Sequence, residues 1–224
     1  QGRCFKWNCT LFAFQPYNTM TIWLTNDDGY DADGICYLKN EIKKIEQTVT
    51  FAPRQNCSGY SAAISLGKDI DVQELNKDTF VISGTPADCS YFGLHGSKKF
   101  DFTQLVSGIN LGSNLGTDIF YSGTVGAAIA GLKLRYPPIA FSVASYQPKD
   151  LDFIAKKCVE ICLYVRNTNI ANRYLVNVNF PDINENNYIG SKLTTLAERE
   201  KPESPIENNS DGLKFRFNAS GKMK

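Results

Sequence analysis

The sequence predicts an α/β protein built around a mostly parallel β-sheet. Short apolar runs rich in β-branched and aromatic residues alternate with segments whose apolar residues recur every three or four positions, a pattern typical of strands alternating with helices. Polar loops rich in glycine and asparagine follow several of the predicted strands. Because ligands of open parallel sheets bind at the carboxyl ends of the strands, these loops are the candidate site.

The composition favours one globular domain and excludes several classes of partner. Of the 224 residues, 42% are hydrophobic, which is enough for a substantial core. The 24 basic residues balance 23 acidic ones, so a nucleic-acid polymer is not an expected partner. No apolar run is long enough to span a membrane. Seven cysteines with no CxxC pair, and a single histidine, indicate reduced thiols in a cytoplasmic protein rather than a zinc site.

The first predicted strand, residues 21–25, ends in an acidic turn in which Asp27 and Asp28 are adjacent. Two carboxylates about 4 Å apart repel by about 4 kcal/mol at an effective dielectric of about 20. They avoid this cost if they diverge into water, share a proton or hold a cation. Asp-Asp-Gly is also a common turn sequence, so a solvated turn is the simpler interpretation of this stretch alone.

The next elements complete a strand–helix–strand unit. Apolar residues from 34 to 45 fall on one helical face, and residues 49–52 form a second strand. Such a unit requires a parallel pair of strands and a right-handed crossover. The loop 53–59 therefore opens on the same sheet edge as the acidic pair. It is either an ordinary surface loop or a ligand loop in which Asn56 and Ser58 offer neutral oxygens.

Residues 60–82 alternate apolar and polar side chains and are predicted to form strands or an antiparallel hairpin. A helix over residues 87–94 follows, with Thr85 as its N-cap and Pro86 just inside its start. His95 ends this helix. A solvated histidine is its expected role, and a general acid is the alternative.

A strand beginning at Leu105 leads into a glycine-rich loop, 108–116, which carries Asn110 and Asn114. Its glycines do not match the dinucleotide-binding fingerprint, which argues against an oxidoreductase. A helix of small residues, 121–132, follows. Its exposed amides and dipole would form an anion site, although Ser122 or Thr124 as a simple N-cap is the alternative.

Three further elements complete the domain, and a polar arm follows it. The domain elements are a strand at 137–143, a helix at 151–165 and a strand at 174–180. From residue 182 the composition becomes polar, and only residues 188–196 and 213–217 indicate strands. This arm cannot bury a core of its own, so it is predicted to dock on a partner or to fray.

The polar loops at 26–29, 56–59, 108–116 and 121–126 are expected to converge on one crevice. Two carboxylates with neutral oxygens suit a hard cation such as Mg²⁺ or Mn²⁺. The amides at the helix start suit a phosphate. The sequence therefore predicts a metal-activated phosphoester hydrolase, in which the ion activates a water and neutralises the phosphoryl oxygens.

Six segments, in order over residues 20 to about 181, resemble the motifs of a known family. They are L-T-N-D-D-G-Y-D-A-D-G-I, F-A-P-R-Q-N-C-S-G, G-T-P-A-D-C, V-S-G-I-N-L-G-S-N-L-G, Y-S-G-T-V-G-A-A and V-N-V-N-F-P. The chain thereby resembles the SurE family of survival-protein nucleotidases and acid-phosphatase-like phosphomonoesterases. The resemblance implies a Rossmann-like three-layer sandwich over residues 20–181, an N-terminal extension over 1–19 outside the fold, and a β-rich C-terminal arm over 182–224 that lacks the family's usual ending.

The resemblance also implies a function and a set of site residues. It implies a 5′-nucleotidase that hydrolyses nucleoside 5′- and 3′-monophosphates, with short polyphosphate as a further substrate. One divalent cation per subunit is expected, Mg²⁺ or Mn²⁺, with Co²⁺ or Ca²⁺ as alternatives. The implied metal ligands are Asp27, Asp28, Ser58 and Asn110, of which Asp27, Asp28 and Asn110 are catalytic. The implied phosphate contacts are Asn114, Ser122, Gly123 and Thr124.

The family resemblance further implies a homodimer or homotetramer that assembles through the C-terminal arms. One departure concerns the second loop, where the family's usual acidic residue after A-P is replaced by Arg54. This departure and the short arm leave a second interpretation open, a non-catalytic module that binds a nucleotide or phosphate.

Overall fold

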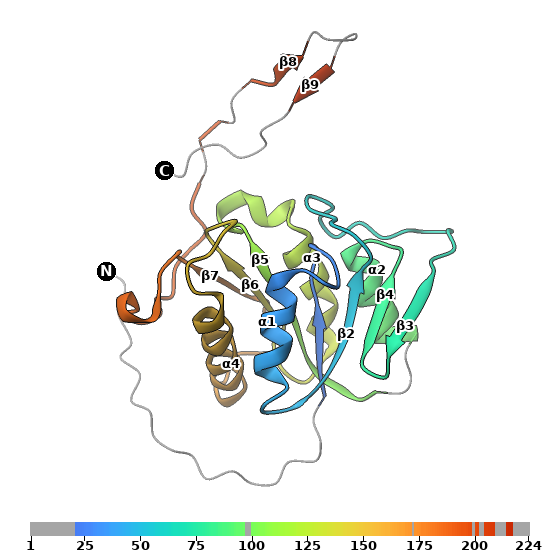
Figure 1. Ribbon diagram of the computed structural model, residues 1–224, viewed down its shortest axis with the longest axis horizontal. Coiled ribbons are helices and arrows are strands. Elements are labelled where there is room, and N and C mark those ends of the chain that lie inside the picture. The colour runs from blue at the N-terminus through green and yellow to red at the C-terminus, as the bar shows by residue number, and fades with distance from the viewer. Residues whose placement is uncertain are drawn as a thin grey trace.

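The computed structural model describes residues 21–96, 100–171, 173–198, 200–201, 204–208 and 214–216. A sheet of seven strands runs through the molecule with helices on both faces (Figure 1). The strands are β1 (Thr21–Thr25), β2 (Gln47–Pro53), β3 (Val72–Asn76), β4 (Thr79–Ile82), β5 (Phe102–Leu111), β6 (Ile139–Val143) and β7 (Val176–Phe180). The α-helices are α1 (Asp33–Ile42), α2 (Pro86–Tyr91), α3 (Gly123–Ala128) and α4 (Leu151–Asn167). The predicted α/β three-layer fold is confirmed.

The strand order of the sheet reverses at one point, between β1 and β5. The order is β3-β4-β2-β1-β5-β6-β7, and every neighbouring pair is parallel except β3 with β4. From β1 the chain first builds outward through β2 and β4, then returns to β5 on the other side of β1 and builds outward through β6 and β7. This is the Rossmann order, and ligands of such sheets bind where the order reverses, outside the carboxyl ends of β1 and β5.

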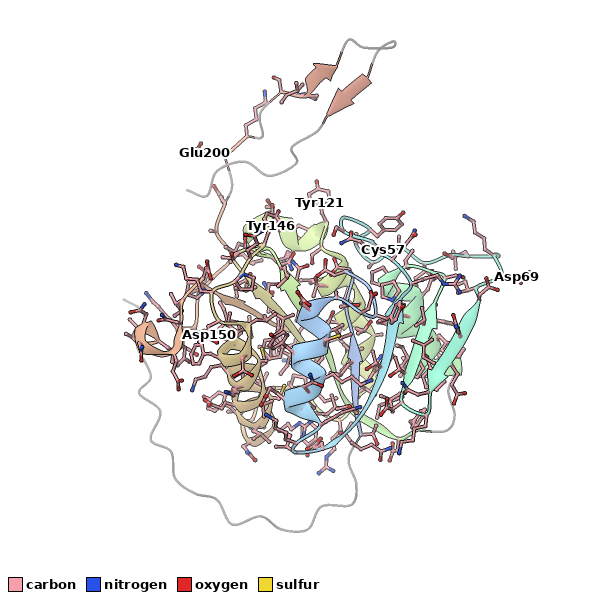
Figure 2. The ribbon with its side chains drawn as sticks, viewed as in Figure 1. Cys57, Asp69, Tyr121, Tyr146, Asp150 and Glu200 are labelled. Atoms are coloured by element: carbon pink, nitrogen blue, oxygen red, sulfur yellow. The ribbon has the colours of Figure 1, made fainter. Side chains whose placement is uncertain are left out.

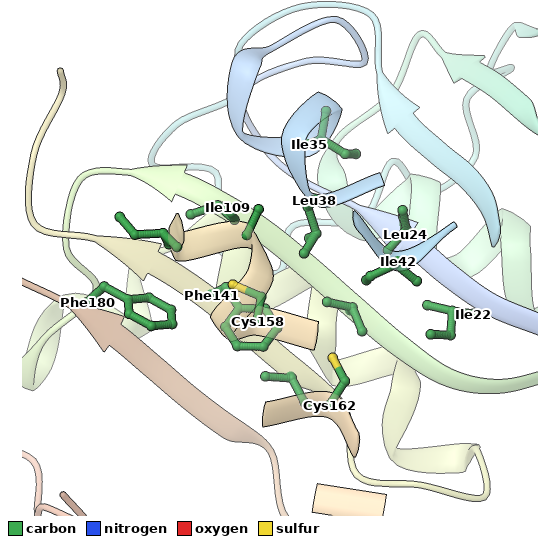
Figure 3. Close-up of a cluster of buried hydrophobic side chains, with 14 of the residues drawn as sticks. Ile22, Leu24, Ile35, Leu38, Ile42, Ile109, Phe141, Cys158, Cys162 and Phe180 are labelled. Carbon is green, nitrogen blue, oxygen red and sulfur yellow. The ribbon is translucent and has the colours of Figure 1, made fainter. Parts of the chain in front are cut away.

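Two cores hold the layers together. On one face, α1 and α4 pack over β1, β5 and β6 through aliphatic side chains and the buried Cys158 and Cys162 (Figure 3). On the other face, α2 and α3 cover a cluster centred on Trp23 and Phe51. Ile35, Leu38 and Ile42 recur along α1 at helical spacing and are buried because they face this sheet, whereas Ile45, expected on the same face, lies beyond the end of α1 and is exposed. None of the described helices is long and apolar enough to cross a membrane.

Several predicted boundaries differ from the structure. β5 runs on to Leu111, into the segment predicted as a loop, because β1 and β6 pair with it on both sides. The segment 60–71 forms turns, and only β3 and β4 make the predicted antiparallel hairpin. The helix predicted at 121–132 is α-helical only as α3 and continues as a 3-10 helix, η3 (Ile129–Lys133). α2 likewise continues as a π-helical segment, η1 (Phe92–Gly96).

The arm differs most from the prediction. The strand predicted at 188–196 is wrong, since this segment holds only one bridge residue, Lys192, outside any strand. A strand needs a ladder of backbone hydrogen bonds to a neighbour, and this segment forms no ladder with a strand of the described sheet. Two short 3-10 helices, η2 (Gly116–Phe120) and η4 (Glu185–Asn187), and an antiparallel ribbon of β8 (Ile206–Asn208) and β9 (Lys214–Arg216) complete the described elements. The extension predicted over residues 1–19 lies outside the described residues.

Candidate active site

The acidic turn that follows β1 is fixed by its neighbours in sequence. The Asn26 Nδ2 donates a hydrogen bond of 2.6 Å to the carbonyl of Gly29. Gly29 has a φ of +119°, which only glycine adopts without strain. The turn leaves Asp27 buried, with 3% of its surface exposed, and Asp28 half-buried. The solvated-turn interpretation therefore fails for Asp27, because a buried carboxylate needs partners.

Asp27 packs against the start of α3, 97 residues further along the chain. The Thr124 Oγ1 donates to its Oδ1 at 2.5 Å, and Thr124 is itself fully buried. A Cβ at Gly123 would lie 2.8 Å from both Cβ and Oδ2 of Asp27, so the carboxylate touches the helix backbone there. Burial raises the pKa of Asp27 to about 6; the Thr124 hydrogen bond opposes this shift and the Asp28 charge adds to it. This carboxylate is therefore held in one place at an energetic cost.

Asp28 contacts the loop that follows β2. The Asn56 Nδ2 donates to the Asp28 Oδ1 at 3.2 Å, and the Asn56 Oδ1 accepts from the Ser58 amide at 2.9 Å. The Cys57 amide donates to the Asp27 carbonyl at 2.7 Å. Burial raises the pKa of Asp28, while hydrogen bonds from the Leu111 backbone and Asn56 oppose the shift. The prediction that this loop reaches the acidic pair is confirmed.

Asn110 lies near the end of β5, the strand that pairs with β1. Its Nδ2 donates to the Gly112 carbonyl at 2.6 Å, and the Gly112 amide donates to the Val143 carbonyl at 2.9 Å. These two bonds tie the Asn110 amide nitrogen to β6. The Asn110 Oδ1 is then the atom available to a ligand.

One cavity of about 470 Å³ gathers most of the predicted site residues. Five of them line it: Asp27, Ser58, Asn110, Asn114 and Ser122. Three predicted residues do not line it. Thr124 and Gly123 contact Asp27, which does, and Asp28 is linked through the Asn56 side chain to the amide of Ser58, which also does. The Ser122 Oγ accepts from the Val125 amide at 3.1 Å, so Ser122 is the N-cap of α3, the alternative that the sequence left open beside a phosphate contact.

Further lining residues were not named as site residues from the sequence, although Tyr121 lies within the predicted loop 121–126. They are Asp118 and Tyr121, from the segment before α3, and Ala144, Ser145 and Tyr146, which follow β6. Tyr121 and Tyr146 lie at the carboxyl edge of the sheet (Figure 2) and are 62% and 84% exposed. The sequence does contain a signal for the three residues after β6. They directly follow a buried strand, and that strand shares its carboxyl edge with β1 and β5.

His95 and Arg54 are not part of this cavity. His95 is exposed, with its ring 4.7 Å from the ring of Tyr91, as the solvated interpretation predicts. Nothing in this arrangement supports His95 as a general acid. Arg54 is also exposed. The presence of Arg54 in place of an acidic residue therefore changes the exposed surface of this loop and leaves the lining of the cavity unchanged.

The donor set suits a hard divalent cation. Burial raises the pKa of both Asp27 and Asp28. No ion pair among the described residues involves either carboxylate, so no basic side chain offsets their charge there. The described residues contain no cluster of three or more His, Cys, Asp or Glu side chains. A cation here would therefore take two carboxylates together with neutral Ser and Asn oxygens, the hard ligands that Mg²⁺ and Mn²⁺ accept.

Comparison with known proteins identifies the family. Residues 22–203 match the family described as survival protein SurE. The chain belongs to the SurE family. The family resemblance carried by the six sequence segments is thus confirmed. The candidate cavity lies where the order of the Rossmann-like sheet reverses.

Relatives of this SurE-family chain carry a functional name. The protein named 5′-nucleotidase SurE from Acinetobacter baylyi is 39% identical over 169 residues, which cover 73% of this chain and 66% of that protein. The protein of the same name from Pseudomonas syringae is 35% identical over 188 residues, covering 84% of this chain and 76% of that one. The crystal structure of the SurE protein from Aquifex aeolicus matches with a TM-score of 0.77 and 33% identity, covering 89% of this chain and 82% of that chain.

Proposed function

We propose that this SurE-family chain is a divalent-metal-dependent phosphomonoesterase, a 5′-nucleotidase that converts nucleoside 5′-monophosphates to nucleoside and phosphate. The observation that carries the proposal is the convergence of Asp27 and Asp28, after β1, with Asn110, near the end of β5, at the edge where the sheet order reverses. The cavity of about 470 Å³ is in the size range of small-molecule sites. The name of the relatives supports the same activity.

The chain's own residues divide into two groups in this proposal. Asp27, Asp28, Ser58 and Asn110 hold the cation, and Asn114 and Ser122 contact the phosphate. A bound divalent cation would neutralise the phosphoryl oxygens and activate a water for attack on phosphorus. For Gly123 and Thr124 a phosphate contact stays a prediction. Their contacts with Asp27 support a role in orienting that carboxylate.

Finer features are part of the same proposal. We propose Mg²⁺ or Mn²⁺ as the cation, one per subunit, with Co²⁺ or Ca²⁺ as alternatives, and 3′-monophosphates and short polyphosphate as further substrates. A cytoplasmic location is supported by the five free cysteines among the described residues, four of them buried. The reduced thiols suit a reducing compartment.

Removal of the metal is expected to abolish turnover. Purified protein is assayed with AMP, GMP, CMP and p-nitrophenyl phosphate in Mg²⁺, in Mn²⁺ and in EDTA, and phosphate release is measured. Activity should disappear in EDTA and return when metal is added in excess. Equal turnover in EDTA, or no turnover with any metal, would contradict the proposal. Tight AMP binding by calorimetry without phosphate release would favour the non-catalytic binding module instead.

We also propose that the arm after residue 182 mediates assembly into a homodimer or homotetramer. Several of its apolar side chains are exposed, among them Ile189 at 93% and Leu193 at 86%. Exposed apolar side chains on an extended segment are typical of a protein–protein contact. Light scattering is expected to give two or four times the chain mass of 24.9 kDa. Aspartate at both positions should shift the mass toward that of one chain; a wild-type mass of one chain would contradict this proposal.

A further inference from the structure

Strand β7 presents two asparagines to the loop that carries Asn114. Side chains alternate between the faces of a strand, so Asn177 and Asn179 share one face. Val176 and Val178 point to the other face, where they pack against the core beneath α4. β7 is the last strand of the described sheet on this side. Its polar face is covered by the segment that follows β5.

Both backbone groups of Asn114 are bound by these two side chains. The Asn114 amide donates to the Asn179 Oδ1 at 2.8 Å. The Asn114 carbonyl accepts from the Nδ2 of Asn177 at 2.9 Å and from the Nδ2 of Asn179 at 3.0 Å. The two asparagines are themselves in contact, with the Asn179 Nδ2 3.4 Å from the Asn177 Oδ1. Residue 114 is thereby held by three bonds to a strand that lies more than 60 residues away in the sequence.

The Asn114 side chain is fixed as well. Its Nδ2 donates to the Ser142 Oγ at 2.7 Å, and Ser142 pairs directly with Asn179 in the sheet. Asn114 is only 6% exposed, yet it lines the cavity. A buried backbone that loses its hydrogen-bond partners must move to find others, because unpaired polar groups are costly. Movement of this backbone would carry the Asn114 amide out of the cavity wall.

The proposed cation ligands make no hydrogen bond to the two β7 asparagines in the described structure. Asn110 is tied through Gly112 to Val143 of β6, and Asp27 is tied to Thr124 of α3. No bond of Asn177 or Asn179 in the described structure reaches these residues. Loss of the β7 asparagines should therefore disturb Asn114 and leave the proposed cation ligands in place.

We propose that Asn177 and Asn179 are positioning residues, which seat Asn114 in the cavity wall so that it can contact the phosphate of the substrate. The inference rests on the proposed function, since that function gives Asn114 its phosphate. It adds to that function a role for β7, which positions Asn114 and makes no bond to the proposed cation ligands.

The experiment compares Asn179→Ala and Asn177→Ala with wild type, and uses Asn186→Ala, an exposed asparagine just beyond β7, as the matched control. Calorimetry measures the Kd of inorganic phosphate in saturating Mg²⁺ and, separately, the Kd of Mn²⁺ alone. KM and kcat for AMP are measured alongside, and circular dichroism checks the fold. In both β7 variants the phosphate Kd and the KM for AMP are expected to rise together by about 10-fold or more, as for other residues that orient a ligand group. The Mn²⁺ Kd should stay within about twofold, and the control should match wild type.

Several outcomes would overturn the inference. One is a folded Asn179→Ala protein with a wild-type phosphate Kd, and another is a parallel loss of Mn²⁺ and phosphate binding in folded protein, which would indicate general loosening of the site. If Asn179→Ala does not fold, Asn177→Ala decides the question, because it removes one donor to the Asn114 carbonyl and introduces no charge. Its phosphate Kd is then expected to rise and its Mn²⁺ Kd to hold. Failure of the proposed function can be told apart from failure of this inference. In the first case wild-type protein releases no phosphate from AMP, and the phosphate Kd values of the variants still test the role of β7.

Discussion

Asparagine in place of Asp27 is expected to lower kcat/KM for AMP by about 10³-fold, the scale on which single groups that stabilise transition-state charge act. Asparagine keeps an oxygen that can accept from the Thr124 hydroxyl, so the local packing is retained. What it removes is the negative charge that a divalent cation needs from its most buried ligand. Cation binding and turnover should therefore fall together.

The same substitution should stabilise the metal-free protein at neutral and alkaline pH. Burial raises the pKa of Asp27 from 3.8 to about 6, so the folded protein binds this proton more tightly than the unfolded chain. Metal-free stability then falls as the pH rises from about 4 to about 6, and remains at the lower level above. Since asparagine carries no charge, the variant avoids this loss and should gain up to about 3 kcal/mol at pH 8.

Urea unfolding in EDTA at pH 5 and pH 8, together with the AMP assay, tests both effects. Asp69→Asn, a change of an exposed aspartate far from the cavity, is the matched control and should alter neither activity nor stability. Full activity in Asp27→Asn would show that the cation is not held here. A loss of stability at pH 8 in EDTA would contradict the energetic cost assigned to the buried carboxylate.

Alanine at Gly34 is expected to destabilise the fold by at least about 3 kcal/mol, toward the upper end of what overpacking costs. A Cβ at this position of α1 would lie 1.8 Å from the backbone oxygen of Ile109 and 2.9 Å from its carbonyl carbon. Neither atom can yield without distortion of β5. α1 must instead move away from the sheet, which opens the core around Ile35 and Leu38, both fully buried.

The sign of this effect is the test. In an exposed helix, glycine to alanine would stabilise by about 1 kcal/mol. Asn40→Ala, on the solvent face of the same helix, should be neutral or slightly stabilising in urea unfolding. Because Ile109 precedes Asn110, the Gly34 variant should also bind Mn²⁺ more weakly in whatever fraction stays folded. Wild-type stability of Gly34→Ala would mean that α1 does not approach β5 this closely.

Local pattern determined much of this protein. Runs such as residues 21–25 and 137–143 are apolar and β-branched, and they form strands wherever a neighbouring strand can pair with them. The amphipathic spacing of residues 34–45 and 151–165 likewise predicts α1 and α4, because periodicity is a property of a short stretch of chain. The acidic pair after the first strand, and the loops expected beside it, follow from the rule that parallel strands share a carboxyl edge.

Only the tertiary structure decided which side chains meet. Thr124 reaches Asp27, and Asn177 reaches Asn114, across 97 and 63 residues of chain. The order of the strands sets such contacts, and no short-range pattern encodes that order. The segment 188–196 shows the converse, since its residues indicate a strand but it forms no ladder with the described sheet. Sequence therefore determined the elements and the chemistry of their ends, and the pairing of distant strands decided burial, support and the shape of the site.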